Sequence, residues 1–214
     1  MSSPELEYQS LLKRYALAGV AFAVCVAVSM IDNDAPATAT VCQIADAACG
    51  VLIAFGWWMP LFCLGLFGCS FFRAIGSLAN PEASARDTTE TAIVGLGSLI
   101  LTLATSWAYL SFGLGRLEGN PPQEEMWFTL SLVVGGAGLL LLQRWAGMMV
   151  CGAGWWWLWR LLEIRATSPI DPSCWGVAFL LATLVLPLSA AVIASWRYLS
   201  QGPQQNAPSC TEQT

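Results

Sequence analysis

The chain has 214 residues, of which 56% are hydrophobic and only 11% are charged, whereas soluble domains carry about 25% charged residues. This composition, with a mean hydropathy of +0.60, excludes an ordinary soluble globule. Because 14 acidic residues oppose nine basic ones, the net charge of −5 also argues against direct binding of nucleic acid.

Catalytic and cofactor chemistry finds little support in this composition. Histidine is absent, so the chain lacks the usual general base and the commonest zinc and haem ligand. No nucleophile with a neighbouring base and no cluster of acids is recognisable. We therefore expect a protein that is not an enzyme and that holds no cofactor or metal.

Apolar segments dominate the chain, and a helix needs about 20 mostly apolar residues to cross a bilayer. These segments predict an all-α polytopic membrane protein with about five transmembrane helices. They cover residues 15–31, 48–72, 91–113, 126–164 and 174–196.

The first two segments have distinctive flanks and interruptions. Residues 15–31 follow Lys13 and Arg14 and precede an acidic turn, which predicts an uncleaved signal anchor. Residues 48–72 contain Pro60, which predicts a kinked helix, because proline removes one backbone hydrogen bond.

The fourth segment is too long for a simple span. Residues 126–164 contain no proline and have Gln143 and Arg144 near the middle, and as one helix they would measure about 58 Å. Two short helices are an alternative, but no turn-forming residue stands at Gln143 or Arg144. We predict one long helix whose membrane part lies between about residues 133 and 159 and contains Arg144.

The distribution of basic residues predicts the orientation. With a cytoplasmic N-terminus, six basic residues lie inside and two outside, which favours five spans in an inner bacterial membrane with the C-terminus outside. The inside group is Lys13, Arg14, Arg73, Arg86, Arg160 and Arg165, and the outside group is Arg116 and Arg197.

Two stretches of the chain look like copies of one unit. Residues 71–110 resemble residues 158–199, most sharply in the Ser-Trp-x-Tyr-Leu motifs at 106–110 and 195–199. The charge count places both repeat loops on the cytoplasmic side, so we predict parallel copies. The predicted parts are a signal anchor and outer loop (1–45), a first hairpin (46–125), a second hairpin (126–199) and a flexible tail (200–214).

Four arginines are the candidate contacts with a lumen, lipid or partner. Arg144 leads, because a charge in the hydrocarbon costs at least about 2.5 to 3.5 kcal/mol and normally faces a partner or water, although snorkelling toward a headgroup is an alternative. Arg73 and Arg86 face an aqueous passage or anionic headgroups, or simply belong to a solvated loop. The fourth is Arg160.

Small residues recur at every fourth position on three predicted helices. Such faces let membrane helices approach closely, either within the chain or between subunits. The positions are Gly19, Ala23 and Ala27, then Gly65 and Cys69, then Gly147 and Cys151. Separately, Cys42 and Cys49 share a polar segment, and whether they pair stays open: a disulfide needs that segment to face an oxidising compartment, and the spacing alone does not decide it.

The loop Asn80-Pro81-Glu82-Ala83 resembles the polar loop of the c subunit of rotary ATP synthases. That family needs a carboxylate in the middle of the following helix, where this chain reads Gly97-Ser98-Leu99-Ile100. Ion translocation by that mechanism is therefore unsupported.

The glycine-rich stretch 65–72, followed by Arg73-Ala74-Ile75-Gly76-Ser77-Leu78, Asn80-Pro81 and a return helix with Gly95 and Gly97, resembles the IcmC/IcmD-like (TraQ/TraR-like) hairpin proteins of Dot/Icm-type type IV secretion and conjugation systems. The resemblance implies a structural component of a translocation conduit. Two alternatives stay open: an accessory subunit of a respiratory, photosynthetic or ATP synthase complex, and a small independent transporter or channel. The expected partners are the lipid bilayer and other membrane subunits, including copies of the chain itself.

Overall fold

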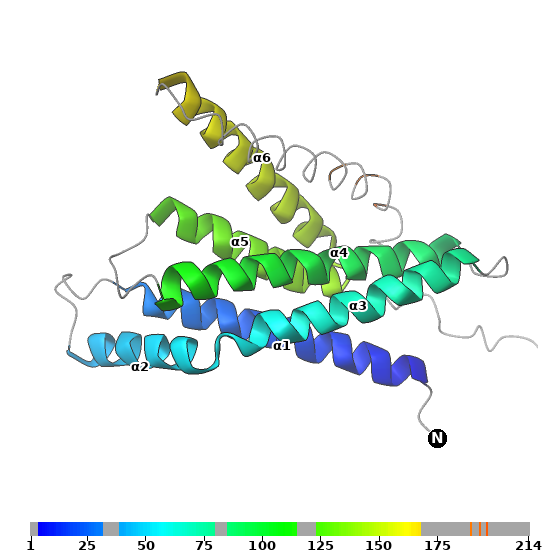
Figure 1. Cartoon of the computed structure of the whole chain (residues 1–214), viewed down its shortest axis with the longest axis horizontal. Helices are drawn as coiled ribbons and strands as arrows, with labels where there is room; N and C mark the ends of the chain where they lie inside the picture. The colour runs from blue at the N-terminus through cyan, green and yellow to red at the C-terminus, as the bar shows by residue number, and fades with distance from the viewer. Residues whose placement is uncertain are drawn as a thin grey trace, which may run out of the picture.

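The computed structural model describes residues 4–31, 39–79, 85–114 and 123–167, together with Ser189, Ile193 and Trp196. The described residues contain helices and no strands (Figure 1), so the all-α prediction is confirmed. The elements are α1 (Pro4–Ser29), α2 (Ala39–Phe55), α3 (Trp58–Ala79), α4 (Ala85–Ala108), a π-helical turn η1 (Tyr109–Leu114), α5 (Gln123–Leu140) and α6 (Arg144–Thr167).

Within the described residues, three stretches are long and apolar enough to cross a membrane. They are Glu7–Ser29, Trp58–Ala79 and Thr88–Leu114. They correspond to the first three predicted segments and are compatible with an integral membrane protein. The fifth predicted segment and the body of the second repeat lie outside the described residues, so the five spans and the repeat stay predictions.

The second predicted segment is two helices, and Pro60 does not kink it. The break lies at Gly56, where the backbone N–H donates to the Leu52 carbonyl at 2.8 Å and where a Cβ atom would collide with that same oxygen. Pro60 falls in the first turn of α3, where a backbone N–H has no acceptor within the helix. The missing N–H of proline therefore removes no hydrogen bond of the helix. The proline therefore suits the start of a helix here.

The fourth predicted segment is also two helices, so the prediction of one long helix is wrong. We call residues 141–143, which separate α5 from α6, the elbow. The Gln143 N–H donates to the Gly138 carbonyl and the Leu142 N–H to the Leu139 carbonyl, both at 3.0 Å, and Leu142 is left-handed with a φ of 55°. These two bonds define a Schellman motif, in which backbone groups make the reversal without glycine at the left-handed position.

Helix α5 lies at the centre of the bundle because small side chains let it approach three other helices (Figure 1). A Cβ atom at Gly136 would lie 3.2 Å from the Leu101 Cβ of α4, and one at Gly19 of α1 would lie 3.3 Å from the Ala137 Cβ. A Cβ at Gly138 would lie only 2.6 Å from the Ala146 Cβ of α6. The run of small residues at 135–138 thus packs against a different helix at nearly every position.

Cys42 and Cys49 are free thiols on one continuous helix, α2. Seven residues of α-helix separate their backbones by about 10.5 Å, beyond the roughly 7 Å that a disulfide spans. The alternative in which they pair is therefore wrong for this structure.

Candidate functional site

The elbow lies near the middle of the bundle's length. Gly136 of α5 packs against Leu101, the central residue of the apolar stretch Thr88–Leu114, and Ala137 packs beside Gly19, close to the centre of Glu7–Ser29. The elbow begins only four residues beyond Ala137, about 6 Å along a helix. It therefore ends α5 well short of the far end of the bundle.

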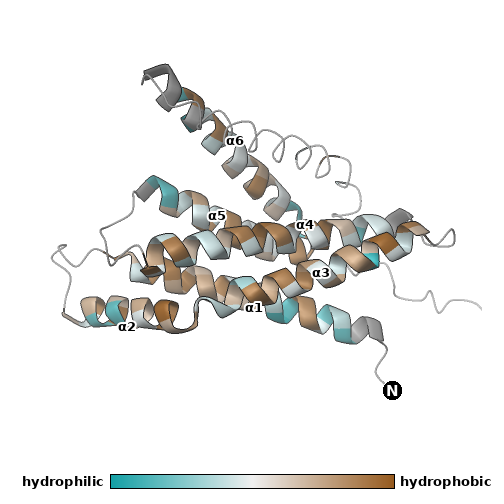
Figure 2. Ribbon diagram, in the orientation of Figure 1, coloured by the Kyte–Doolittle hydropathy of each residue, from teal (hydrophilic) through white to brown (hydrophobic). Residues whose placement is uncertain are grey.

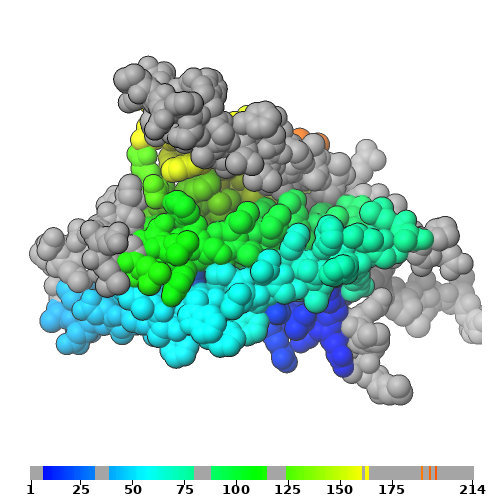
Figure 3. Space-filling model, viewed as in Figure 1, coloured from blue at the N-terminus to red at the C-terminus, as the bar shows by residue number. Residues whose placement is uncertain are grey.

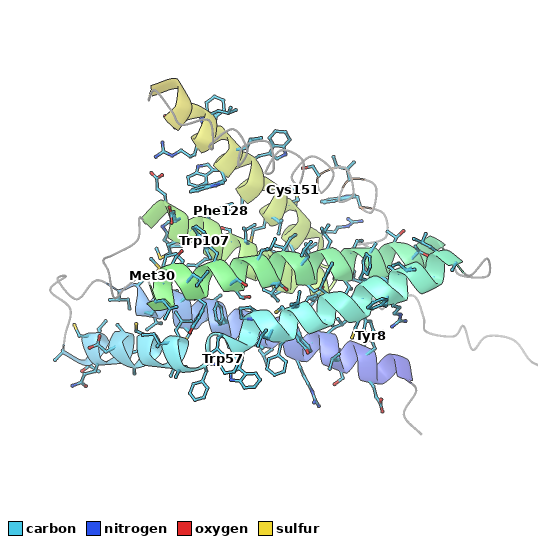
Figure 4. All side chains as sticks on the ribbon, in the orientation of Figure 1. Tyr8, Met30, Trp57, Trp107, Phe128 and Cys151 are labelled. Atoms are coloured by element: carbon cyan, nitrogen blue, oxygen red, sulfur yellow. The ribbon has the colours of Figure 1, made fainter. Side chains whose placement is uncertain are left out.

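Helix α6 runs back along α5 toward the end where α5 began. Arg160 of α6 donates from Nε and Nη2 to Glu124 in the first turn of α5, at 3.0 and 2.7 Å, and from Nη1 to Glu163 at 2.8 Å. One helical turn closer to the elbow, the rings of Phe128 and Trp157 stack with centroids 4.8 Å apart (Figure 4). Helices α5 and α6 thus form a hairpin that is tied together at its open end.

Arg160 is an ion-pairing residue of this hairpin rather than an unpaired contact group. Its hydrogen bonds with Glu124, and secondarily with Glu163, raise the pKa of Arg160 above its usual value. The arginine therefore stays charged across the physiological range, and the pair is solvent-screened because both partners are exposed.

Arg73 lies at the opposite end of the bundle from Arg160. The Arg73 guanidinium is 4.5 Å from the ring of Tyr8, near the beginning of α1 (Figure 4, where Tyr8 is labelled). The prediction that Arg73 and Arg160 lie on one side is therefore wrong for these two positions, whereas the repeat itself stays a prediction. The error follows from the missed elbow. Because α6 runs back along α5, its C-terminal residues lie at the end of the bundle where α5 begins.

Arg144, the first residue of α6, directly follows the elbow. Its guanidinium carbon lies 5.0 Å from the centroid of the Trp196 ring, and its Nε is buried without a hydrogen-bond partner. Among the described residues, Arg144 makes no hydrogen bond or ion pair. The structure therefore places the leading sequence candidate near the bundle's midpoint, in contact with an aromatic face and lacking a counter-charge there.

Carboxylates lie outside the central parts of the long apolar segments. The sequence has no aspartate or glutamate in residues 8–31, 47–81, 91–117, 126–162 or 172–211. The central part of each long apolar segment falls in these ranges, and Glu7, Glu90 and Glu163 lie near segment ends. Hence no long apolar segment carries an acid in its central part.

The buried hydroxyl groups of α4 are already satisfied by the helix itself. Ser98, Thr102 and Thr105 donate to backbone carbonyls one turn earlier, at 2.8, 2.7 and 2.6 Å. Hydroxyls bonded in this way add little polarity to a surface. The part of the chain that the structure describes also contains no group of three or more possible metal ligands.

The remaining predicted residues have mixed positions. Gly19, Ala23 and Gly147 are buried within the chain and Cys151 is half-buried, whereas Ala27, Gly65 and Cys69 are exposed. Arg86 is in the first turn of α4, and only its backbone is described. The predicted arginines are thus not brought together into one site.

Sequence reasoning missed the small residues that bury the elbow. The run Gly135-Gly136-Ala137-Gly138 was the available signal, because four consecutive small residues give a helix access to neighbours on every side. The ion pair between Glu124 and Arg160 gave no such signal in the sequence, because the two residues meet only when the chain reverses at the elbow.

No protein-family model, curated protein or solved structure matches the chain.

Proposed function

We propose that this protein is a non-enzymatic structural subunit of a larger membrane complex. The observation that carries the proposal is the outer face of α3. In the most apolar 18-residue part of this helix only 17% is buried, compared with 56% in the Thr88–Leu114 stretch. Figure 3 shows α3 as a continuous surface beside α4.

The open face of α3 combines large apolar side chains with gaps between them. A Cβ atom at Gly65, Gly68 or Gly76 would meet nothing within 4 Å. Bulky exposed residues flank these glycines, namely Leu61, Phe62, Leu64, Phe71, Phe72 and Ile75. Small residues at such a surface allow a neighbouring membrane helix to pack closely, which supports a role in assembly.

A type IV secretion or conjugation conduit is the complex that we propose. The resemblance to the IcmC/IcmD-like proteins rests on residues that lie in α3, in the connection after it and in α4, next to the open face of α3. An accessory subunit of a respiratory, photosynthetic or ATP synthase complex would use the same face. An independent transporter receives less support, because the hydroxyls of α4 are bonded to their own helix.

We propose further that the N-terminus is cytoplasmic in a bacterial inner membrane. Lys13, Arg14, Arg73 and Arg86 gather toward the end where α1 begins, whereas Arg160 and Arg165 lie toward the other end. Figure 2 shows hydrophilic residues in the early part of α1 and at the start of α5, with apolar residues along the helices between them. Under the positive-inside rule, the end richer in basic residues faces the cytoplasm.

Gentle detergent extraction of the native membrane, followed by native mass spectrometry, tests the proposal. We expect the chain in a particle with other subunits, and we expect Gly65→Leu to reduce their recovery. Gly50→Leu is the matched control, because Gly50 of α2 is also a helical glycine with open space around it. A wild-type chain that elutes alone, as a monomer with bound lipid, would refute the proposed function.

A further inference from the structure

We infer that Arg144 binds a carboxylate carried in mid-membrane by a transmembrane helix of a partner subunit. The inference rests on the proposed function and names the chemistry of one partner. It would make the elbow the point at which this chain recognises an acidic membrane helix.

The first step is the depth of the charge. Arg144 is seven residues beyond Ala137, so its backbone lies at most about 10 Å beyond the centre of two apolar stretches, whereas the hydrocarbon of a bilayer extends about 15 Å from its midplane. A guanidinium at this depth requires a counter-charge, water or protein dipoles. Arg144 is therefore where the chain has the strongest electrostatic need for a partner.

The second step is the source of the counter-charge. The apolar stretches carry acids only near their ends, at Glu7, Glu90 and Glu163. The described carboxylates nearest to Arg144 in sequence are Glu124, Glu125 and Glu163, and they belong to the open end of the hairpin. Glu124 and Glu163 already bind Arg160. Among the described residues no carboxylate pairs with Arg144, which favours a counter-charge from another molecule.

The third step favours a protein carboxylate over a lipid phosphate. A snorkelling arginine extends its guanidinium to the headgroups, but the Arg144 guanidinium is held against the Trp196 ring and its Nε is buried in protein. The side chain as a whole is only partly buried, so a group from outside can reach it. The planar guanidinium offers parallel N–H donors that match the two oxygens of a carboxylate.

The surface next to Arg144 suits a helix. Met148 is one turn further along α6 on the same face and is 55% exposed, and Trp145 is also exposed. An apolar helix that packs on these side chains would bring its own side chains to the elbow. We expect an aspartate or glutamate at the level of Arg144 within that helix.

Site-specific photo-crosslinking identifies the partner. A photoreactive amino acid replaces Met148 in the full-length chain, native membranes are irradiated, and the crosslinked peptides are sequenced by mass spectrometry. We expect adducts to a transmembrane segment that contains an aspartate or glutamate. Adducts to lipid alone, or to segments without an acid, would overturn the inference.

Charge removal then tests the contact. Arg144→Leu should lower recovery of the crosslinked partner at least tenfold, and Arg144→Lys should restore part of it. Arg14→Leu, which removes an exposed arginine from α1, should change recovery little. Replacing the partner's acid by leucine should cause the same loss without altering this chain, which covers the case in which Arg144→Leu impairs folding.

Combining both leucine substitutions should restore recovery above that of either single variant, because two unpaired charges have been removed together. If Arg144→Leu and the partner variant both leave recovery unchanged, the inference fails while the proposed function stands. If the wild-type chain has no partner in the membrane, the proposed function fails as well.

Discussion

Replacing Gly97 by alanine tests whether close packing of α4 on α5 holds the elbow in place. The new Cβ would lie 2.8 Å from the Leu139 Cβ and 3.3 Å from the Gly136 carbonyl oxygen. Non-bonded carbons prefer about 3.5 to 4.0 Å, so the helices must separate by about 1 Å. Neither obstacle is the far end of a flexible side chain, so the strain has no local relief.

The expected loss in free energy of unfolding follows from comparing Gly97→Ala with Gly152→Ala. Overpacking a well-packed interior costs about 1–3 kcal/mol, whereas alanine in place of glycine within a helix gains about 1 kcal/mol. Gly152→Ala receives the same helical gain with nothing within 4 Å of the new methyl group. The difference between the two variants in free energy of unfolding should therefore be about 1–3 kcal/mol, with Gly97→Ala less stable.

The assay is unfolding of the purified protein in mild detergent by titration with sodium dodecyl sulfate, followed by circular dichroism. The midpoint for Gly97→Ala should fall below that for Gly152→Ala, which should equal or exceed the wild-type midpoint. Equal midpoints for the two variants would show that α4 and α5 do not approach as closely as described, and the reasoning about the elbow would lose its basis.

Three further predictions concern topology, the elbow and the thiols. In a chain whose native cysteines are replaced, Glu163→Cys and Gln9→Cys should react with an impermeant maleimide from opposite sides of the membrane; labelling from one side would mean that α6 does not fold back. Leu142→Pro should destabilise the protein by about 3 kcal/mol or more in the same detergent titration, since proline lacks the N–H and cannot adopt a positive φ, whereas Leu142→Asn tolerates that φ and should cost less. Cys42 and Cys49 should stay unlinked under mild oxidation, and an intramolecular disulfide detected by intact mass would contradict the continuous α2.

Hydrophobicity predicted the long apolar helices because each membrane-length stretch sums the preferences of about 20 residues. Local signals were less informative. Pro60 was interpreted as an interior kink, yet one proline is equally compatible with the first turn of a helix, and the sequence does not say where that turn begins. The position of Gly56 became meaningful only once the backbone contact with Leu52 was known.

The elbow escaped prediction because no residue type marks it. Leucine rarely adopts a left-handed φ, so the reversal at Leu142 depends on two backbone hydrogen bonds and on the packing of α6 against Gly135 and Gly138. One missed reversal then moved Arg160 to the wrong end. Arg144 was nevertheless a good candidate, because its charge within an apolar run did not depend on how that run folds.

The hairpin of α5 and α6 has a consequence for how the protein enters a membrane during synthesis. Because α5 stops near mid-depth and α6 returns, the pair presents no complete span that would remain in the bilayer by itself. The surfaces that receive α5 belong to α1 and α4, and both precede it in the chain. The helices that contact α5 are therefore synthesised before it. A nascent chain that ends at residue 122 would already contain its long apolar helices, including the surfaces at Gly19 and Gly97 against which α5 packs.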